Sequence, residues 1–195
     1  LDVLIAHLRE EVARVDDEAE GTESVVAALE AERESRRAEL LAALDSDRYF
    51  VLLRSFGAAI KELPEVDGDV RALALAELKR LGKAASGVKA GSSDEELHAL
   101  RIRAKRARYA GELAALAGGK KLARYVEAVT AVQDVVGEHQ DSVVAEAKLR
   151  ELVAPDRAVA VGRLIERERE RRRDARARYP DAIADALARG RAALA

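Results

Sequence analysis

The chain has 195 residues, with 34 Lys and Arg against 36 Asp and Glu, no Cys, Met or Trp, and only 3% aromatic residues. This length suits one domain or two small ones, and a core with so few rings must be built from Ala, Leu, Val and Ile. The lack of cysteine excludes disulfides, thiolate metal sites and cysteine nucleophiles. No stretch approaches the roughly 18 uncharged apolar residues of a membrane span. This composition predicts a soluble, cytoplasmic protein built from long helices.

The first part of the chain shows helical periodicity interrupted by turn signals. Apolar positions predict a first helix from Leu1 to about Ala19, broken at Gly21-Thr22. Further helices are predicted over residues 24–44, 48–61 and 69–85. The turn at residues 45–47 separates the first two of these, and Pro64 ends the next. Residues 86–93, with two glycines, predict a flexible loop.

The second part begins with a capping signal. Ser93 and Glu96 have the spacing of a capping box, which predicts a helix start there and a helix that runs to about Ala117. Gly118-Gly119 ends this helix. Further helices are predicted over residues 121–153 and from Pro155 to about 178, and Pro180 is expected to open a last short helix. Because no strand signal appears, we predict an all-α bundle.

Charge is sorted along the chain although the net charge is only -2. Residues 10–34 hold ten acidic and two basic residues, whereas residues 97–109 hold five basic residues and no acidic one. Residues 163–178 hold eight arginines against four acids. Such sorting predicts a basic surface assembled from separate segments.

One helical stripe within residues 97–113 gathers the basic side chains His98, Arg101, Lys105 and Arg108. Helical spacing places apolar residues on both sides of this stripe. A solvated stripe would have polar flanks, so this pattern predicts a groove between helices. Arg103 and Arg106 point elsewhere and are expected to be ordinary surface charges.

Two interpretations of the stripe remain open. Crowded cations are costly to desolvate and need either carboxylates from neighbouring helices or an anionic ligand. The first interpretation is an internal salt-bridge network, with Glu112 as the first candidate partner. The second is a polyphosphate-like or nucleic acid ligand, because Arg forks and Lys ammonium groups suit phosphate oxygens. His98 has no nucleophile beside it, and His7 and His139 complete no metal motif with it, so neither a catalytic role nor a metal site is predicted.

The chain also contains a diverged internal repeat. The segment 2–6 is similar to 141–145, and four residues recur at an offset of 130. These pairs are Arg33 with Arg163, Arg37 with Arg167, Arg48 with Arg178, and Tyr49 with Tyr179. Two related helical halves would place two sets of basic helices at a shared groove.

The segment 97–109, LHALRIRAKRARY, resembles the signature helix of the CHAD domain, an α-helical family named for its histidine. The segment 132–141 resembles the part that follows it, and residues 1–5 resemble the matching part of a first half. The resemblance covers essentially the whole chain. It implies a single domain of two pseudo-symmetric four-helix bundles, with residues 1–90 as the remainder of the first half and residues 91–195 as the second. The first half is incomplete, because the family's first signature helix would stand before Leu1.

The resemblance also implies a function, namely the binding of inorganic polyphosphate in the basic groove and association with polyphosphate granules. The family's basic motif falls on His98, Arg101, Lys105 and Arg108, with Tyr109 beside them. The repeat adds Arg33, Arg37, Arg163 and Arg167 as second-rank positions. Third-rank positions are Lys79, Arg80 and Lys83, on the helix before the loop. No cofactor is implied.

The leading hypothesis is therefore a non-enzymatic polyphosphate-binding module. Nucleic acid binding is disfavoured by the small number of aromatic residues and the lack of a reading motif. A structural or regulatory scaffold, with a purely internal basic stripe, is a further alternative. A phosphohydrolase would need an acidic cluster for Mg²⁺ beside the basic helix, where none is found. A homodimer is a further expectation, since an incomplete first half would expose apolar surface.

Overall fold

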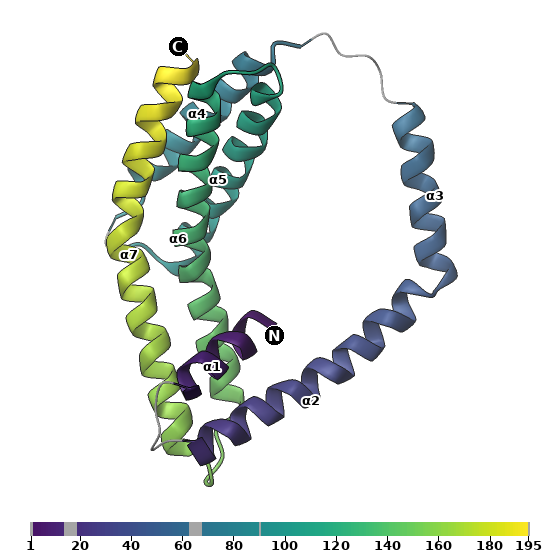
Figure 1. Ribbon diagram of the computed structural model, residues 1–195, viewed down its shortest axis with the longest axis vertical. Helices are drawn as coiled ribbons and strands as arrows, with labels where there is room; N and C mark the ends of the chain where they lie inside the picture. Colours follow the sequence, from purple (N-terminus) through teal and green to yellow (C-terminus); the bar gives the residue numbers. More distant parts are fainter. Residues whose placement is uncertain (1, 14–18, 63–67, 90, 195) are drawn as a thin grey trace. The chain divides into compact units, whose positions relative to one another are not determined.

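The computed structural model describes residues 2–13, 19–62, 68–89 and 91–194, without the side chains of residues 3, 10–13, 19 and 20. These residues form helices and no strand, which confirms the all-α prediction (Figure 1). The helices are α1 (Asp2–Ala13), α2 (Ala19–Leu44), α3 (Asp47–Lys61), α4 (Val70–Gly87), α5 (Asp94–Ala115), α6 (Lys120–Glu151) and α7 (Ala158–Leu194).

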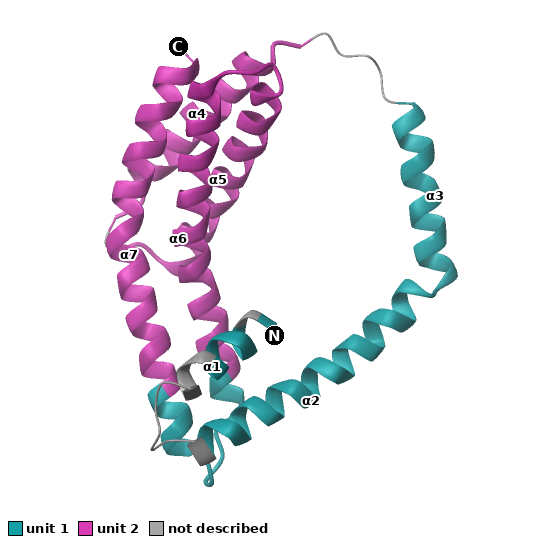
Figure 2. Ribbon diagram, in the orientation of Figure 1, with its two compact units in different colours: residues 1–67, 149–163 teal, residues 68–148, 164–195 magenta. Residues whose placement is uncertain are grey.

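The chain divides into two compact units (Figure 2). Unit 1 holds residues 1–67 and 149–163, and unit 2 holds residues 68–148 and 164–195. The long helices α6 and α7 therefore contribute to both units. The division at residue 90 was implied by the family resemblance, and both it and the pseudo-symmetry of the two halves stay predictions.

Unit 2 is a set of four helices around one apolar core. Leucines of α4 and α5, valines of α6 and Ile183 of α7 meet in this core, with Tyr125 and Tyr179 as its only aromatic members among the described residues. Small residues let the helices approach closely. A Cβ at Gly111 of α5 would lie 2.9 Å from the Tyr125 ring, and one at Gly190 of α7 would lie 2.6 Å from a Leu78 methyl carbon. These two glycines leave space for the ring of Tyr125, a residue of α6, to pack against both α5 and α7.

The start of α5 is fixed as the sequence predicts. The Ser93 hydroxyl oxygen accepts from the Glu96 backbone N–H at 3.3 Å, and the Ser93 backbone N–H donates to the Glu96 carboxylate at 2.7 Å. This confirms the capping box, which stabilises the first turn of a helix. At the other end, Gly118 and Gly119 have φ of 87° and 125°, a region that favours glycine, so they end the helical segment as expected.

The predicted helix break at Gly21-Thr22 is wrong, because α2 begins at Ala19 and runs through both residues. Gly21 lies inside the helix and allows a close contact with another segment instead of forming a turn. A Cβ at this position would lie 2.9 Å from the Ala160 Cβ, so only glycine lets this part of unit 1 close. Thr22 is buried as well. The predicted end of the first helix falls on residues 14–19 and Pro64 on residues 63–67, so both lie largely outside the described part of the chain.

The two later prolines were also predicted incorrectly. Pro155 lies in a turn before α7 and not in its first helical turn. Pro180 opens no new helix, since α7 continues through it for 37 residues. Tyr179 and Ile183 are buried on either side of the proline, and this packing outweighs the roughly 3 kcal/mol that a proline costs inside a helix.

Unit 1 is less fully packed among its described residues. Ile5 and Leu8 of α1 and Val25 and Leu29 of α2 are buried. Arg157 donates to the Ser24 hydroxyl at 3.3 Å and to the Leu152 carbonyl at 2.8 Å, which fastens the turn before α7 to α2. In contrast, α3 has no buried residue at all.

Candidate anion-binding site

The four basic residues His98, Arg101, Lys105 and Arg108, here called the α5 basic stripe, border the core of unit 2. On one side of the stripe, Leu97, Leu100, Ala104, Ala107 and Gly111 are buried against the other helices. On the other side, three large side chains stay open, with Ile102, Tyr109 and Leu113 exposed by 42%, 54% and 43%. Within unit 2 the stripe therefore has a buried apolar flank and an open apolar flank.

Arg101 is a partly buried cation of the stripe. Its side chain is half-buried and lies beside α6, where a Cβ at Gly137 would be 3.9 Å from the Arg101 Nε. The Nε atom is buried without a hydrogen-bond partner. No described carboxylate pairs with Arg101 or with the half-buried Lys105 one turn further along the helix. Both groups thus remain available to an anion.

Arg108 is only partly available. It donates to Glu112 at 2.7 Å, and its guanidinium carbon lies 4.7 Å from the centre of the Tyr109 ring, which is a cation–π distance. Its Nε atom is nevertheless buried without a partner. The salt-bridge interpretation, with Glu112 as partner, is therefore confirmed for Arg108, whereas Arg101 and Lys105 form no such pair with a described residue.

His98 lies at the exposed start of the stripe. Its Nδ1 atom is 3.2 Å from the amide oxygen of Gln140 on α6. This contact orients the ring of the exposed His98.

The third-rank positions on α4 are all exposed. Arg80 is paired with Glu77 on its own helix. Lys79 and Lys83 have no ion pair with a described residue and are free surface cations.

The second-rank positions are shared between the two units. Arg163, in unit 1, is exposed, and Arg167, in unit 2, is half-buried. Each already interacts with another group. Arg33 lies 3.7 Å from the Asp2 carboxylate, and Arg37 lies 3.5 Å from that of Glu34, so both are loosely paired.

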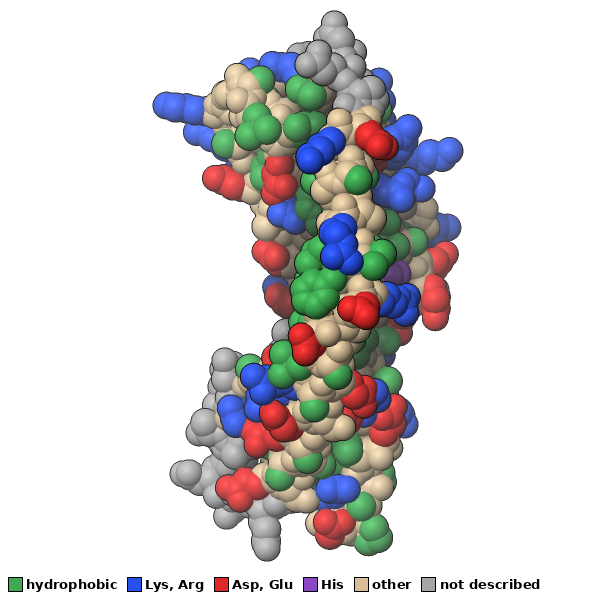
Figure 3. Space-filling model, turned by 90° about the vertical axis from the view of Figure 1, so that its right-hand side faces the viewer, with side chains coloured by type: hydrophobic (Ala, Val, Ile, Leu, Met, Phe, Trp, Pro, Cys, Tyr) green, Lys and Arg blue, Asp and Glu red, His purple; other side chains and the backbone are tan. Residues whose placement is uncertain are grey.

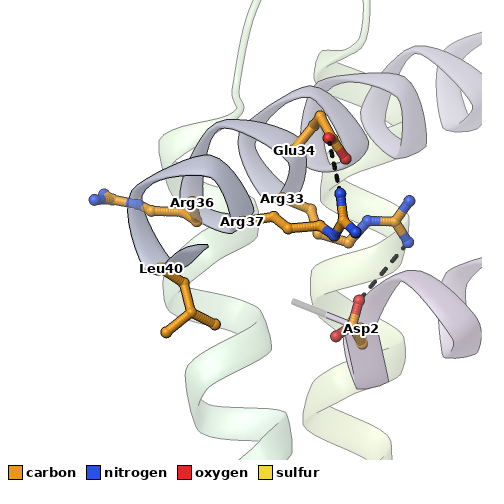
Figure 4. Close-up of a pocket in the computed structure, with 6 residues that line it drawn as sticks. All are labelled: Asp2, Arg33, Glu34, Arg36, Arg37 and Leu40. Carbon is orange, nitrogen blue, oxygen red and sulfur yellow. Dashed lines mark hydrogen bonds and ion pairs between the residues drawn. The ribbon is translucent and has the colours of Figure 1, made fainter. Parts of the chain in front are cut away.

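Unit 1 contains a cavity of about 620 Å³ that sequence reasoning did not find. Its lining residues are Asp2, Arg33, Glu34, Arg36, Arg37 and Leu40 (Figure 4). In the close-up, Arg33 and Arg37 extend toward the Asp2 side, whereas Arg36 extends the opposite way. The spacing of Arg33 and Arg37, four residues apart, was the available signal, because such residues share one side of a helix. Two carboxylates among six lining residues reduce its positive charge.

Several arginines of α7 pair with carboxylates, and the basic surface that charge sorting predicts stays a prediction. Arg172 donates to Glu146 at 2.8 Å and to the Ser142 carbonyl at 3.2 Å, and Arg169 donates to Glu146 at 3.1 Å. Arg171 pairs with Glu168, which is 1% exposed. These arginines therefore link α7 to α6 or neutralise a buried carboxylate.

A related cluster fastens the start of α5. Arg176 of α7 donates to the Asp94 carboxylate at 2.7 Å and to the Ser92 carbonyl at 2.7 Å. The His139 Nε2 atom lies 3.2 Å from the same Asp94 carboxylate, and His139 is only 2% exposed. Asp94 is thus shared by three helices, and it holds α5 one turn before His98.

Among the described residues, no group of three or more His, Cys, Asp or Glu side chains could hold a metal ion. In the same part of the chain, every helix is too short or too polar to span a membrane.

Comparison with protein-family models gives a match to the CHAD domain over residues 1–150. The chain belongs to the CHAD domain family. Two curated relatives from Mycobacterium tuberculosis, the uncharacterized proteins MT2285 of strain CDC 1551 / Oshkosh and Rv2226 of strain ATCC 25618 / H37Rv, are each 34% identical over 119 residues. The match covers 56% of this chain but only 22% of each relative. No solved structure matches the chain.

Acid is expected to destabilise this CHAD domain through His139. Burial, followed by the nearby Arg176 and Arg172 guanidinium groups, lowers the pKa of His139, although Asp94 opposes this shift. His139 in the folded state therefore stays neutral at pH values near 6.5, where the histidine of the unfolded chain takes up a proton. Stability should fall as the pH drops below about 6.5, and His139→Gln should remove this part of the loss.

The measurement is the free energy of unfolding between pH 8 and pH 5. Carboxylates whose pKa is lowered, such as that of Glu166, contribute little over this range and contribute alike in the two proteins. If the free energy of unfolding depends on pH equally in the wild type and in His139→Gln, the result contradicts a buried neutral His139.

Proposed function

We propose that this chain binds inorganic polyphosphate along the α5 basic stripe and catalyses no reaction on it. The observation that carries the proposal is the half-buried Arg101, whose Nε atom has no partner and which pairs with no described carboxylate. Lys105 shares its lack of a counter-ion. CHAD domains are associated with the binding of polyphosphate, and this family membership agrees with the open cations.

The cost of holding these charges favours an anionic ligand. Arg101 and Lys105 lie four residues apart on one side of α5, where like charges repel and partial burial weakens their hydration. An anion that binds between them would supply the missing acceptors and relieve the repulsion. Since Arg108 already has Glu112, the two central cations should contribute most to binding.

The length of the stripe favours a linear polyanion over a single phosphate. From His98 to Arg108 the helix rises about 15 Å, at 1.5 Å per residue, which is several times the width of one phosphate group. A chain of phosphates can contact successive cations, with Arg as a two-pronged donor and Lys as a mobile point charge. Lys79 and Lys83 on α4 of the same unit belong to this proposal as further contacts, and association with polyphosphate granules would follow from it.

The test is a calorimetric titration of the wild-type chain with long-chain polyphosphate at 50 mM and 200 mM salt. Binding by several phosphate contacts should weaken steeply with salt, with a slope near -0.7 per contact if single-stranded nucleic acid is a guide. Orthophosphate should bind far more weakly, because it reaches only one cation at a time. Single-stranded DNA of equal charge should compete poorly, since stacking platforms are few. Equal affinity for DNA and polyphosphate would contradict the proposed specificity.

A further inference from the structure

The helix α3 and the adjoining end of α2 expose an unusual number of large apolar side chains. In α3, Phe50, Leu52, Leu53, Phe56 and Ile60 are exposed by 46% to 67%, and no α3 residue is buried. Leu40, Leu41 and Leu44 at the end of α2 are exposed by 38% to 56%. Hydrophobic side chains also reach the surface drawn in Figure 3, among charged ones of both signs.

Most of the large apolar side chains of α3 share one broad side of the helix, whereas the exposed Val51 lies on the opposite side. Tyr49, Leu52, Phe56 and Ala59 recur at the spacing of three and four that forms a coiled-coil seam, and Leu53 and Ile60 widen it. Single exposed apolar residues need no explanation, but several large ones along one side of a helix that has no buried residue are typical of a surface that packs against another helix.

The charges at the edge of this seam indicate which partner fits. Arg48, Ser55 and Glu62 recur every seven residues and therefore lie along the same edge of α3. If a second α3 packs in the opposite direction, the same edge of the two copies lies side by side and runs in opposite directions. Arg48 of each copy then faces Glu62 of the other. Packing in the same direction would instead place this charged edge beside the opposite, apolar edge of the other copy, which carries Leu53 and Ile60. Neither Arg48 nor Glu62 has an ion pair with a described residue of its own chain.

We propose that α3 is a self-association surface, on which a second copy of this chain packs its own α3 in antiparallel orientation. The seam residues form the buried centre, the two Arg48–Glu62 pairs fix the direction, and Ser55 lies close to the two-fold axis. This interface is independent of the α5 basic stripe, so polyphosphate binding neither requires nor tests it.

The first test measures the mass of the full chain by sedimentation velocity at concentrations from 1 to 200 µM. The wild type should form dimers, and Phe56→Glu should weaken dimerisation at least 100-fold, because it places a charge in the seam. The matched control is Ala58→Glu on the opposite side of α3, which should leave the dimer intact. Since α3 has no buried residue, both variants should keep the wild-type circular dichroism spectrum. A monomeric wild type would overturn the proposal.

The second test checks the orientation. Arg48→Glu and Glu62→Arg should each weaken the dimer about fivefold, and the double variant should restore it to within about twofold, because the two pairs are re-formed with reversed charge. As the chain has no cysteine, Ser55→Cys should form a disulfide-linked dimer on oxidation, whereas Ala58→Cys should not. Cross-linking by Ala58→Cys alone, or a wild type that stays monomeric and floats with anionic vesicles, would overturn the proposal.

Discussion

Replacing Arg101 and Lys105 together with alanine should weaken polyphosphate binding on the order of 100-fold. A hydrogen bond between charged groups contributes about 1.5 to 3 kcal/mol, and the double variant removes the two cations of the stripe that have no carboxylate among the described residues. The slope of log affinity against log salt should also become less steep by roughly 1.4, since two phosphate contacts are lost. Both quantities come from calorimetric titrations at several salt concentrations.

The matched control is the pair Arg103→Ala and Arg106→Ala. These residues lie on the same helix but on other sides of it, so the control changes the net charge equally and leaves the stripe complete. Its affinity should fall less than threefold. If both double variants lose affinity to the same extent, binding follows the general charge of the chain and the stripe has no special role.

Gly190→Val should lower the stability of the protein by about 3 kcal/mol, at the upper end of the usual range for an overfilled core. A Cβ at this position would lie 2.6 Å and 2.7 Å from the two Leu78 methyl carbons and 2.9 Å from a Tyr125 ring carbon. Leu78 and Tyr125 are buried at 3% and 0% exposure, so neither can move aside without disturbing the core. For a chain of this length the midpoint of thermal unfolding should fall by about 10 °C.

Gly162→Val on the same helix is the control, because a Cβ there meets nothing within 4 Å. Its midpoint should change by no more than about 2 °C, since valine and glycine differ little in helix propensity compared with the cost of a clash. A stable Gly190→Val variant would show that α4 and α7 do not approach as closely as the structure indicates.

Local signals in the sequence predicted local structure well. The capping box at Ser93, the end of the helical segment at Gly118-Gly119 and the buried flank of the α5 basic stripe all depend on residues within a few positions of one another. The features that were wrong depend on residues far away in sequence. Gly21 continues a helix because Ala160 packs against it, and Pro180 is tolerated because Tyr179 and Ile183 are buried beside it.

The candidate site shows the same division. Helical spacing was sufficient to predict that His98, Arg101, Lys105 and Arg108 share one side of α5. It could not show which cations find carboxylates, because Glu146, which neutralises arginines of α7, comes from another helix. Nor could it find the buried contact between Asp94 and His139, whose partners are 45 residues apart in the printed sequence.

The most direct test of the central claim is the side-chain NMR signal of Arg101 during a titration with polyphosphate. The Nε–H group of Arg101 is buried and donates to no described acceptor, so a phosphate oxygen would be its first partner. The signal, assigned by its loss in Arg101→Lys, should shift and saturate with the polyphosphate concentration, whereas that of Arg103 should stay in place. An unchanged Arg101 signal in the presence of tightly bound polyphosphate would contradict the account, because binding would then take place away from the α5 basic stripe.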